Sequence, residues 1–137
     1  MYALWKKKNI NLSKALNSDE INELLHAVKD YRGVFMRDNL PKNIKEGQSI
    51  VINLDNSYGK GTHWTALYRD KQKINYFDSF GLQPPQELID LYPRVKIVSN
   101  TYQFQPMNNI NCGAYAVYFI REMTSGTSVF DTLFKLF

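Results

Sequence analysis

The fold is decided by the stretch Asn111-Cys112-Gly113-Ala114-Tyr115-Ala116-Val117-Tyr118-Phe119-Ile120, in which a polar loop runs directly into an apolar segment. Residues 112–123 are apolar on most sides of a helical projection, which is typical of a buried central helix. Cys112, the one cysteine among 137 residues, therefore stands where this helix begins. The partial positive charge of a helix N-terminus stabilises an anion, and a thiolate is the form in which cysteine attacks a carbonyl.

A lone cysteine has a second interpretation, because unpaired cysteines are commonly inert core residues. The polar lead-in at 108–111 favours a reactive thiol instead. One cysteine also excludes an internal disulfide and a Cys-rich zinc site. His26 and His63 are the two histidines of the chain, so we do not expect a His-based metal site.

Upstream of Cys112, two residues could act on the thiol, one as its general base and the other by orienting that base. His63 follows the Gly-bearing loop 55–61 and opens a predicted strand at 62–68, and Asp78 follows a predicted strand at 73–77. The turn at 69–72 between the strands suits an antiparallel hairpin, so His63 and Asp78 should be cross-strand neighbours within reach of each other. His63 would act as general base and Asp78 would orient it. The alternatives are a structural histidine and a turn aspartate.

A glutamine could complete such a site. Gln105 lies seven residues before Cys112, and a loop that brings it over the nucleophile would aim its amide at a developing oxyanion, beside the Cys112 N–H group. Gln103 is a rival that spacing alone does not exclude. Trp64 would line the substrate cleft or simply fill the core.

The rest of the chain predicts a single α+β domain over residues 1–137. A helix should begin at Asn17 or Ser18, and its apolar residues recur at helical spacing with His26 outside that stripe. The other predicted elements are a connecting segment at 34–41, strands at 49–54, 95–98 and 102–104, a short helix from Pro84-Pro85 to Leu91, and a last helix at 128–136.

Composition sets the broad class. Hydrophobic residues make up 44% and charged residues 22% of the chain, which is ordinary for a soluble globular protein. The formal net charge of +4 is consistent either with simple solubility or with an anionic partner such as nucleic acid. The start of the sequence lacks the apolar core of a signal peptide, and no run is long enough to span a bilayer. We therefore expect a protein that is not secreted, has no membrane partner and is a monomer.

At this point the motifs resemble those of a known family. The order Gly61-Thr62-His63-Trp64, then Phe77-Asp78-Ser79-Phe80-Gly81, then Gln105, then Asn111-Cys112-Gly113 looks like that of the adenovirus-type (adenain-like) and SUMO-protease-type cysteine peptidases. The segments 34–41 and 61–67 look most like the viral, capsid-processing branch.

The resemblance implies a mixed, mostly antiparallel sheet packed on a central helix that bears the nucleophile. It assigns Cys112 as nucleophile, His63 as base, Asp78 as orienter and Gln105, rather than Gln103, as oxyanion donor. The implied function is an endopeptidase that cleaves viral capsid or structural precursors next to small residues such as Gly, at virus assembly sites in host cytoplasm or nucleus and in the virion. One alternative is a deSUMOylating or deubiquitinating peptidase of ubiquitin-like modifiers, and another is a basic nucleic-acid-binding module with an inactive site.

The sequence also differs from the adenovirus-type and SUMO-protease-type enzymes that it resembles. The adenovirus-type enzyme is longer and is activated by DNA and by a peptide tethered through a second cysteine, whereas here Cys112 is alone. No cofactor is required by the sequence, and a noncovalent peptide or DNA activator stays open. Asp78 stands where the adenovirus-type enzyme uses Glu, as in the SUMO proteases. The chain is too short for the large docking regions expected of many SUMO proteases.

Overall fold

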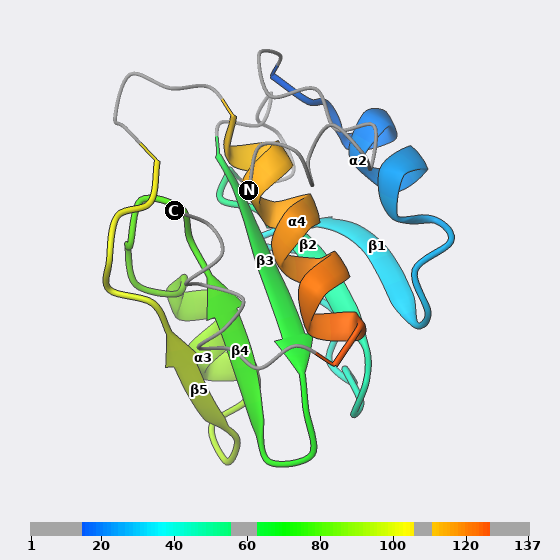
Figure 1. Ribbon diagram of the computed structural model, residues 1–137. Helices are drawn as coiled ribbons and strands as arrows, with labels where there is room; N and C mark the ends of the chain where they lie inside the picture. Colours follow the sequence, from blue (N-terminus) through cyan, green and yellow to red (C-terminus); the bar gives the residue numbers. More distant parts are fainter. Residues whose placement is uncertain (1–14, 56–62, 106–110, 127–137) are drawn as a thin grey trace.

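The computed structural model describes residues 15–55, 63–105 and 111–126, and these residues form one mixed sheet with helices on both faces (Figure 1). The strands are β1 (Tyr31–Met36), β2 (Ser49–Asn53), β3 (Trp64–Arg69), β4 (Lys73–Phe77) and β5 (Lys96–Ser99). The helices are α2 (Ser18–Leu25), α3 (Gln86–Leu91) and α4 (Cys112–Thr124). The helix predicted at 128–136 lies outside the described residues.

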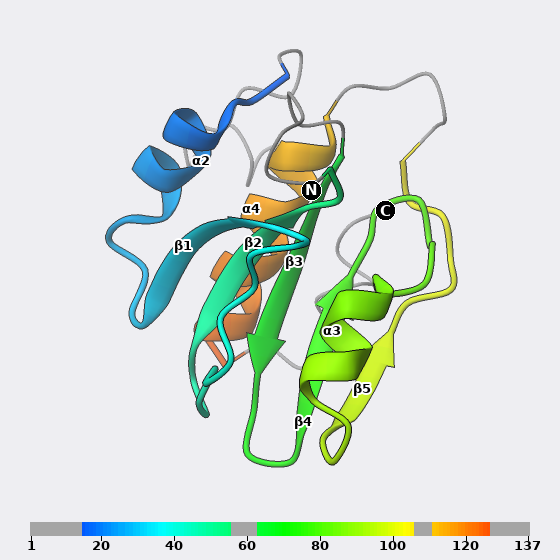
Figure 2. The same cartoon turned by 180° about the vertical axis from the view of Figure 1, so that it is seen from behind.

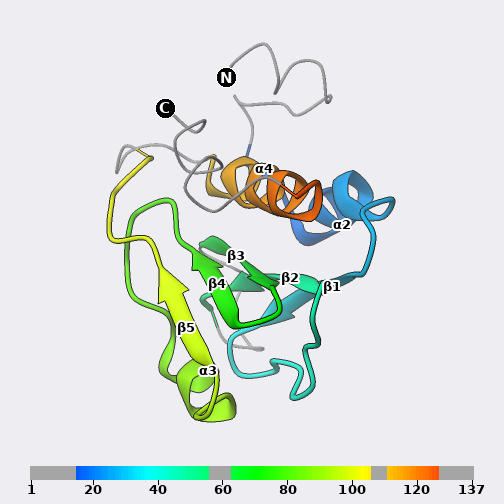
Figure 3. The same ribbon diagram turned by 60° about the horizontal axis from the view of Figure 1, so that its bottom comes forward.

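The helices form two layers around the sheet. Helices α2 and α4 cover one face, and α3 lies against the other face near β5 (Figures 2 and 3). Each face has its own apolar core: Val51, Ala66 and Phe77 point toward α4, whereas Ile50, Ile52 and Leu67 point toward α3. Every residue of β2 is buried, as expected for a strand covered on both faces.

The strand order is β1-β2-β3-β4-β5. The pairs β2–β3 and β3–β4 are antiparallel, and β1–β2 and β4–β5 are parallel. The prediction of a mixed α+β sheet is confirmed, but "mostly antiparallel" is wrong, since two pairings are of each kind. Parallel neighbours need a crossover rather than a hairpin, and α3 supplies the crossover between β4 and β5.

Two predicted segments differ from the structure. Residues 31–36 form strand β1, where we expected a connecting segment beginning at Val34. All six of its residues are half-buried and its register shifts between Tyr31 and Val34, so the alternation that marks a strand is lost. Conversely, 102–104 is not a strand, because the Phe104 N–H group donates to the Ser79 carbonyl instead of to a strand partner.

Helix α2 begins as its sequence predicts. Asn17 is the N-cap, and its side chain accepts from the Glu20 N–H group at 2.8 Å while the Glu20 carboxylate accepts from the Asn17 N–H group at 3.1 Å. This reciprocal pair is a capping box. Ile21 and Leu25 are fully buried and His26 is exposed, so the apolar stripe faces the core as predicted.

Helix α4 is the central helix. Ten of its thirteen residues are buried, and it packs on β3 with α2 at its side. It is the most apolar helix of the described part, yet no described helix has the length and hydropathy needed to cross a bilayer. Burial of α4 fixes the place of Cys112, its first residue.

Gly81 lies in the segment after β4, at the point where that segment packs closely against the segment after β5. Its φ of +76° is one that residues with a Cβ rarely adopt, and an added Cβ would lie 2.9 Å from the carbonyl oxygens of both Thr101 and Tyr102. The close approach of two backbone segments here therefore requires glycine.

We predict that Gly81→Ala destabilises the fold by about 2–4 kcal/mol, the sum of a left-handed backbone penalty and overpacking. Gly126→Ala is the matched control, because its φ is +91° and an added Cβ would meet nothing within 4 Å. It should lose only about 1–2 kcal/mol. Urea unfolding monitored by fluorescence measures both, and equal losses would show that the contacts to 101–102 carry no weight.

Candidate active site

His63 and Asp78 form a buried pair at one end of the β3–β4 hairpin. His63 Nε2 lies 2.8 Å from Asp78 Oδ1, and the side chains are 10% and 0% exposed. Since β3 pairs Ala66 with Phe77, continuing the register places His63 opposite Phe80 and makes Asp78 its diagonal neighbour. The predicted contact is present, although it is diagonal rather than directly opposite.

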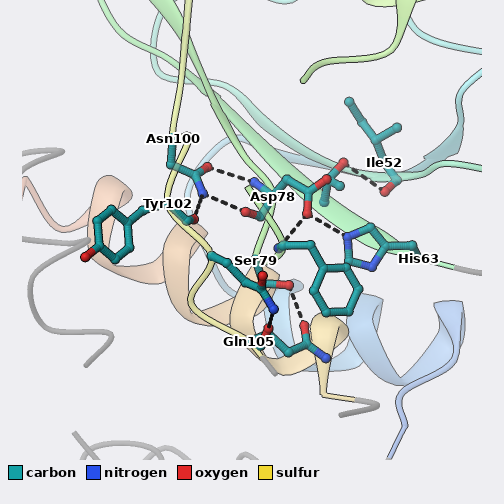
Figure 4. A network of polar contacts seen from close by, with 10 residues as sticks. Ile52, His63, Asp78, Ser79, Asn100, Tyr102 and Gln105 are labelled. Carbon is teal, nitrogen blue, oxygen red and sulfur yellow. Dashed lines mark hydrogen bonds and ion pairs between the residues drawn. The ribbon is translucent and has the colours of Figure 1, made fainter. Parts of the chain in front are cut away.

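Asp78 is held by several hydrogen bonds. Its Oδ1 atom also accepts from the Phe80 N–H group at 2.8 Å. Its backbone N–H group donates to Asn100 Oδ1 at 3.0 Å, and its carbonyl accepts from Asn100 Nδ2 at 2.6 Å. Figure 4 shows the Asn100 side chain hydrogen-bonded to the backbone of Asp78, while the Asp78 carboxylate faces His63. Asn100 thus holds the Asp78 backbone, and the Phe80 N–H group holds the carboxylate.

The His63 imidazole is enclosed on one face by a ring. Phe80 stacks on it with the ring centroids 4.6 Å apart and an angle of 19° between the planes. Burial by itself lowers the pKa of His63, but the hydrogen bond to Asp78 and the interaction with Cys112 outweigh it and raise the pKa to about 9. The imidazolium form is therefore favoured at neutral pH.

Cys112 is buried beside this imidazole at the N-terminus of α4. Burial alone raises the pKa of its thiol. Interactions with His63 and with the backbone N–H groups of Trp64 and Gly113 lower the pKa by more than burial raises it, so the net shift is downward. Within the described residues, His63 Nδ1 has no hydrogen-bond partner. Since Nε2 is engaged by Asp78, Nδ1 is the imidazole nitrogen that is available to a second group.

The structure separates the two candidate glutamines. Gln105 is fully buried, and its Oε1 atom accepts a hydrogen bond from the Ser79 hydroxyl (Figure 4). Its N–H group donates to the Ser79 carbonyl at 2.9 Å. Gln103 is exposed and donates to the Gln105 carbonyl at 2.8 Å. Gln105 is therefore tied to the residue next to Asp78, and Gln103 only supports its backbone.

Trp64 contributes to the packing around α4. Its side chain is half-buried, its Nε1 atom donates to the Leu16 carbonyl at 2.9 Å, and a Cβ added at Gly113 would lie 3.2 Å from its Cδ1 atom. These contacts fit the core-filling interpretation, and the substrate-lining role stays a prediction.

Three residues of the site escaped the sequence analysis: Ser79, Phe80 and Asn100. Ser79 and Phe80 belong to the quoted motif after β4 but were given no role. Asn100 directly follows β5, which runs parallel to β4, and the ends of parallel neighbours meet at one sheet edge. Asn100 could therefore have been placed next to Asp78 only if the parallel pairing of β4 with β5 had been known. Among the described residues, no three His, Cys, Asp or Glu side chains converge in a way that could hold a metal ion.

Part of the chain is similar in sequence to viral cysteine proteases. Over 93 residues the chain is 30% identical to the SUMO-1 cysteine protease S273R of a warthog isolate of African swine fever virus and to the cysteine protease S273R of its Badajoz strain. The match covers 57% of this chain and 34% of each relative, so the chain matches about a third of their length. No family model matches the chain.

A solved structure shares the fold. The crystal structure of the African swine fever virus pS273R protease superposes with a TM-score of 0.64 at 19% identity, covering 93% of this chain and 62% of that one. The α+β cysteine-peptidase fold that we expected is therefore supported. The comparisons do not specifically show an adenovirus-type relationship.

We predict that Cys112 reacts with iodoacetamide as a thiolate below the pKa of an ordinary thiol, roughly 8.5. Because protonated His63 stabilises the thiolate, His63→Ala should move the inflection of the rate–pH profile upward and slow alkylation at pH 6.5 by at least about 10-fold. The signal is unambiguous because the chain has one cysteine. Identical profiles for the two proteins would contradict the pairing.

We predict that Asn100→Ala lowers stability by about 1–3 kcal/mol, since two buried backbone groups of Asp78 lose their partner, and that it also moves the alkylation profile upward. Asn75→Ala is the control: Asn75 is also buried, but it lies in the middle of β4, and its side chain donates to the Tyr68 carbonyl and to Asp70 rather than to Asp78. It should lose stability with an unchanged profile. A shift in both variants would show that the effect is not specific to Asp78.

Proposed function

We propose that this chain is a cysteine peptidase that hydrolyses peptide bonds through an acyl-enzyme. The observation that carries the proposal is the buried row Asp78–His63–Cys112, in which the carboxylate accepts from one imidazole nitrogen and the other is left for the thiol. The relatives matched by sequence are named as cysteine proteases. Without a base and a residue that orients it, a lone cysteine would give no reason to propose catalysis.

The reaction follows from the charges of these groups. The Cys112 thiolate attacks the carbonyl carbon, and negative charge moves onto the carbonyl oxygen. As the C–N bond breaks, the His63 imidazolium gives its proton to the leaving amine and a thioester forms. Water then attacks the thioester with neutral His63 taking its proton, and the thiolate leaves with the acid product. Asp78 stabilises the imidazolium in both steps.

Gln105 and the backbone N–H group of Cys112 are proposed as the oxyanion donors. Gln105 is fully buried, and an amide in a site that excludes water stabilises developing charge more strongly than one in solvent. The Ser79 contact and the exposure of Gln103 favour Gln105 for this role.

For the substrate, we propose a SUMO-type ubiquitin-like modifier. Some of the relatives are named as SUMO-1 cysteine proteases, which favours this alternative over the precursor-cleaving endopeptidase that the sequence first suggested. Cleavage of viral precursors is the second candidate, since the relatives belong to a virus. Both substrates would present small residues to the site.

We predict that a peptide vinyl sulfone ending in Gly-Gly modifies wild-type protein once, at Cys112, and leaves Cys112→Ser unmodified. Since His63 maintains the thiolate, His63→Ala should slow labelling by about 10²-fold or more. Mass spectrometry measures both. An unmodified wild type, with or without DNA and precursor peptides, would contradict the proposed function.

A panel of tagged substrates then separates the two substrate classes. Release of the tag from SUMO, and not from precursor peptides cut after small residues, is the expected result. The reverse pattern would return the precursor-cleaving function to first place. Tight, salt-sensitive DNA binding by a chain that modifies no substrate would favour the nucleic-acid-binding alternative.

A further inference from the structure

Ser79 has no role in the proposed reaction, yet its hydroxyl is hydrogen-bonded to Gln105, the proposed oxyanion donor. Its side chain is fully buried, and its Oγ atom donates to Gln105 Oε1. Its carbonyl accepts the N–H groups of Phe104 at 2.8 Å and Gln105 at 2.9 Å. One residue therefore holds both the backbone and the side chain of Gln105.

In the structure the Ser79 hydroxyl donates to the carbonyl end of the Gln105 amide. A glutamine amide has an acceptor end and a donor end of nearly equal size. With Oε1 occupied by the Ser79 hydroxyl, Nε2 points away from Ser79 (Figure 4). An oxyanion needs a donor and would be repelled by the carbonyl end, so the amide must be held in this orientation for Gln105 to serve.

Ser79 also connects the two halves of the site. It directly follows Asp78, whose backbone is gripped by Asn100, and Gln105 follows five residues after Asn100. The segment 100–105 is thus joined at both of its ends to residues 78–79, by Asn100 to Asp78 and by Gln105 to Ser79. The orienter of the base and the proposed oxyanion donor are therefore positioned by the same pair of segments.

We infer that Ser79 is a positioning residue that orients the Gln105 amide toward the oxyanion. The inference rests on the proposed function, because it assigns Ser79 a part in the same acyl transfer. It differs from a purely structural role in one respect: Ser79 should matter for attack on a carbonyl and not for the reactivity of the thiolate.

The test compares two reactions of the same cysteine in Ser79→Ala. Hydrolysis of a peptidyl-Gly-Gly coumarin amide forms an oxyanion, whereas alkylation by iodoacetamide does not. We expect kcat to fall on the order of 10-fold with KM changed less than about 2-fold, because a misaligned oxyanion donor costs part of the roughly 10²–10³ that a lost donor costs. The rate and pH profile of alkylation should stay as in wild type.

Ser49→Ala is the matched control, since Ser49 is equally buried but its Oγ atom has no hydrogen-bond partner among the residues that the structure describes. It lies at the end of β2 that is remote from the site, beside Tyr68. This variant should leave both reactions unchanged.

A double-mutant cycle shows whether Ser79 acts through Gln105. If it does, Ser79→Ala in the Gln105→Ala background should change kcat by less than about 2-fold. Additive losses, or equal losses of hydrolysis and alkylation in Ser79→Ala, would overturn the inference while leaving the peptidase intact. A wild type that alkylates normally but hydrolyses no substrate would overturn the proposed function and the inference with it.

Discussion

The buried hydrogen bond between His63 and Asp78 is the interaction on which the rest of the site depends. An imidazole whose side chain is only 10% exposed would ordinarily be neutral, because burial disfavours its charged form. The Asp78 carboxylate reverses that preference, and the resulting imidazolium lowers the pKa of the Cys112 thiol. The helix N-terminus supports the thiolate but does not supply the proton that the leaving amine would need in the proposed reaction.

Much of the surrounding fold serves to keep this hydrogen bond in place. The hairpin β3–β4 brings the two residues together, Asn100 binds the backbone of Asp78, and the Phe80 N–H group donates to its carboxylate. Phe80 covers the imidazole. The approach of 101–102 to Gly81, which leaves no room for a Cβ, closes the same corner. Residues from two loops, and not from α4 alone, therefore determine the reactivity of Cys112.

The sequence predicted the parts of this arrangement that depend on local pattern. Strand β4 matches its predicted range, Lys73–Phe77, and the His63–Asp78 contact followed from a hairpin whose turn was recognisable. Strand β1 was missed because Gly33 and a register shift interrupt its alternation. The choice between Gln103 and Gln105 could not come from strand periodicity, because 102–104 is no strand. Ser79 and Asn100 required the parallel pairing of β4 with β5, a nonlocal contact that no local pattern encodes.

The most direct test of this account is an NMR titration of the His63 imidazole in the intact chain. We expect His63 to titrate near pH 9 and Cys112→Ala to lower its pKa, because the thiolate that favours the imidazolium has been removed. A pKa near the ordinary value of about 6.5 that is insensitive to Cys112→Ala would contradict the ion pair, and with it the proposed chemistry.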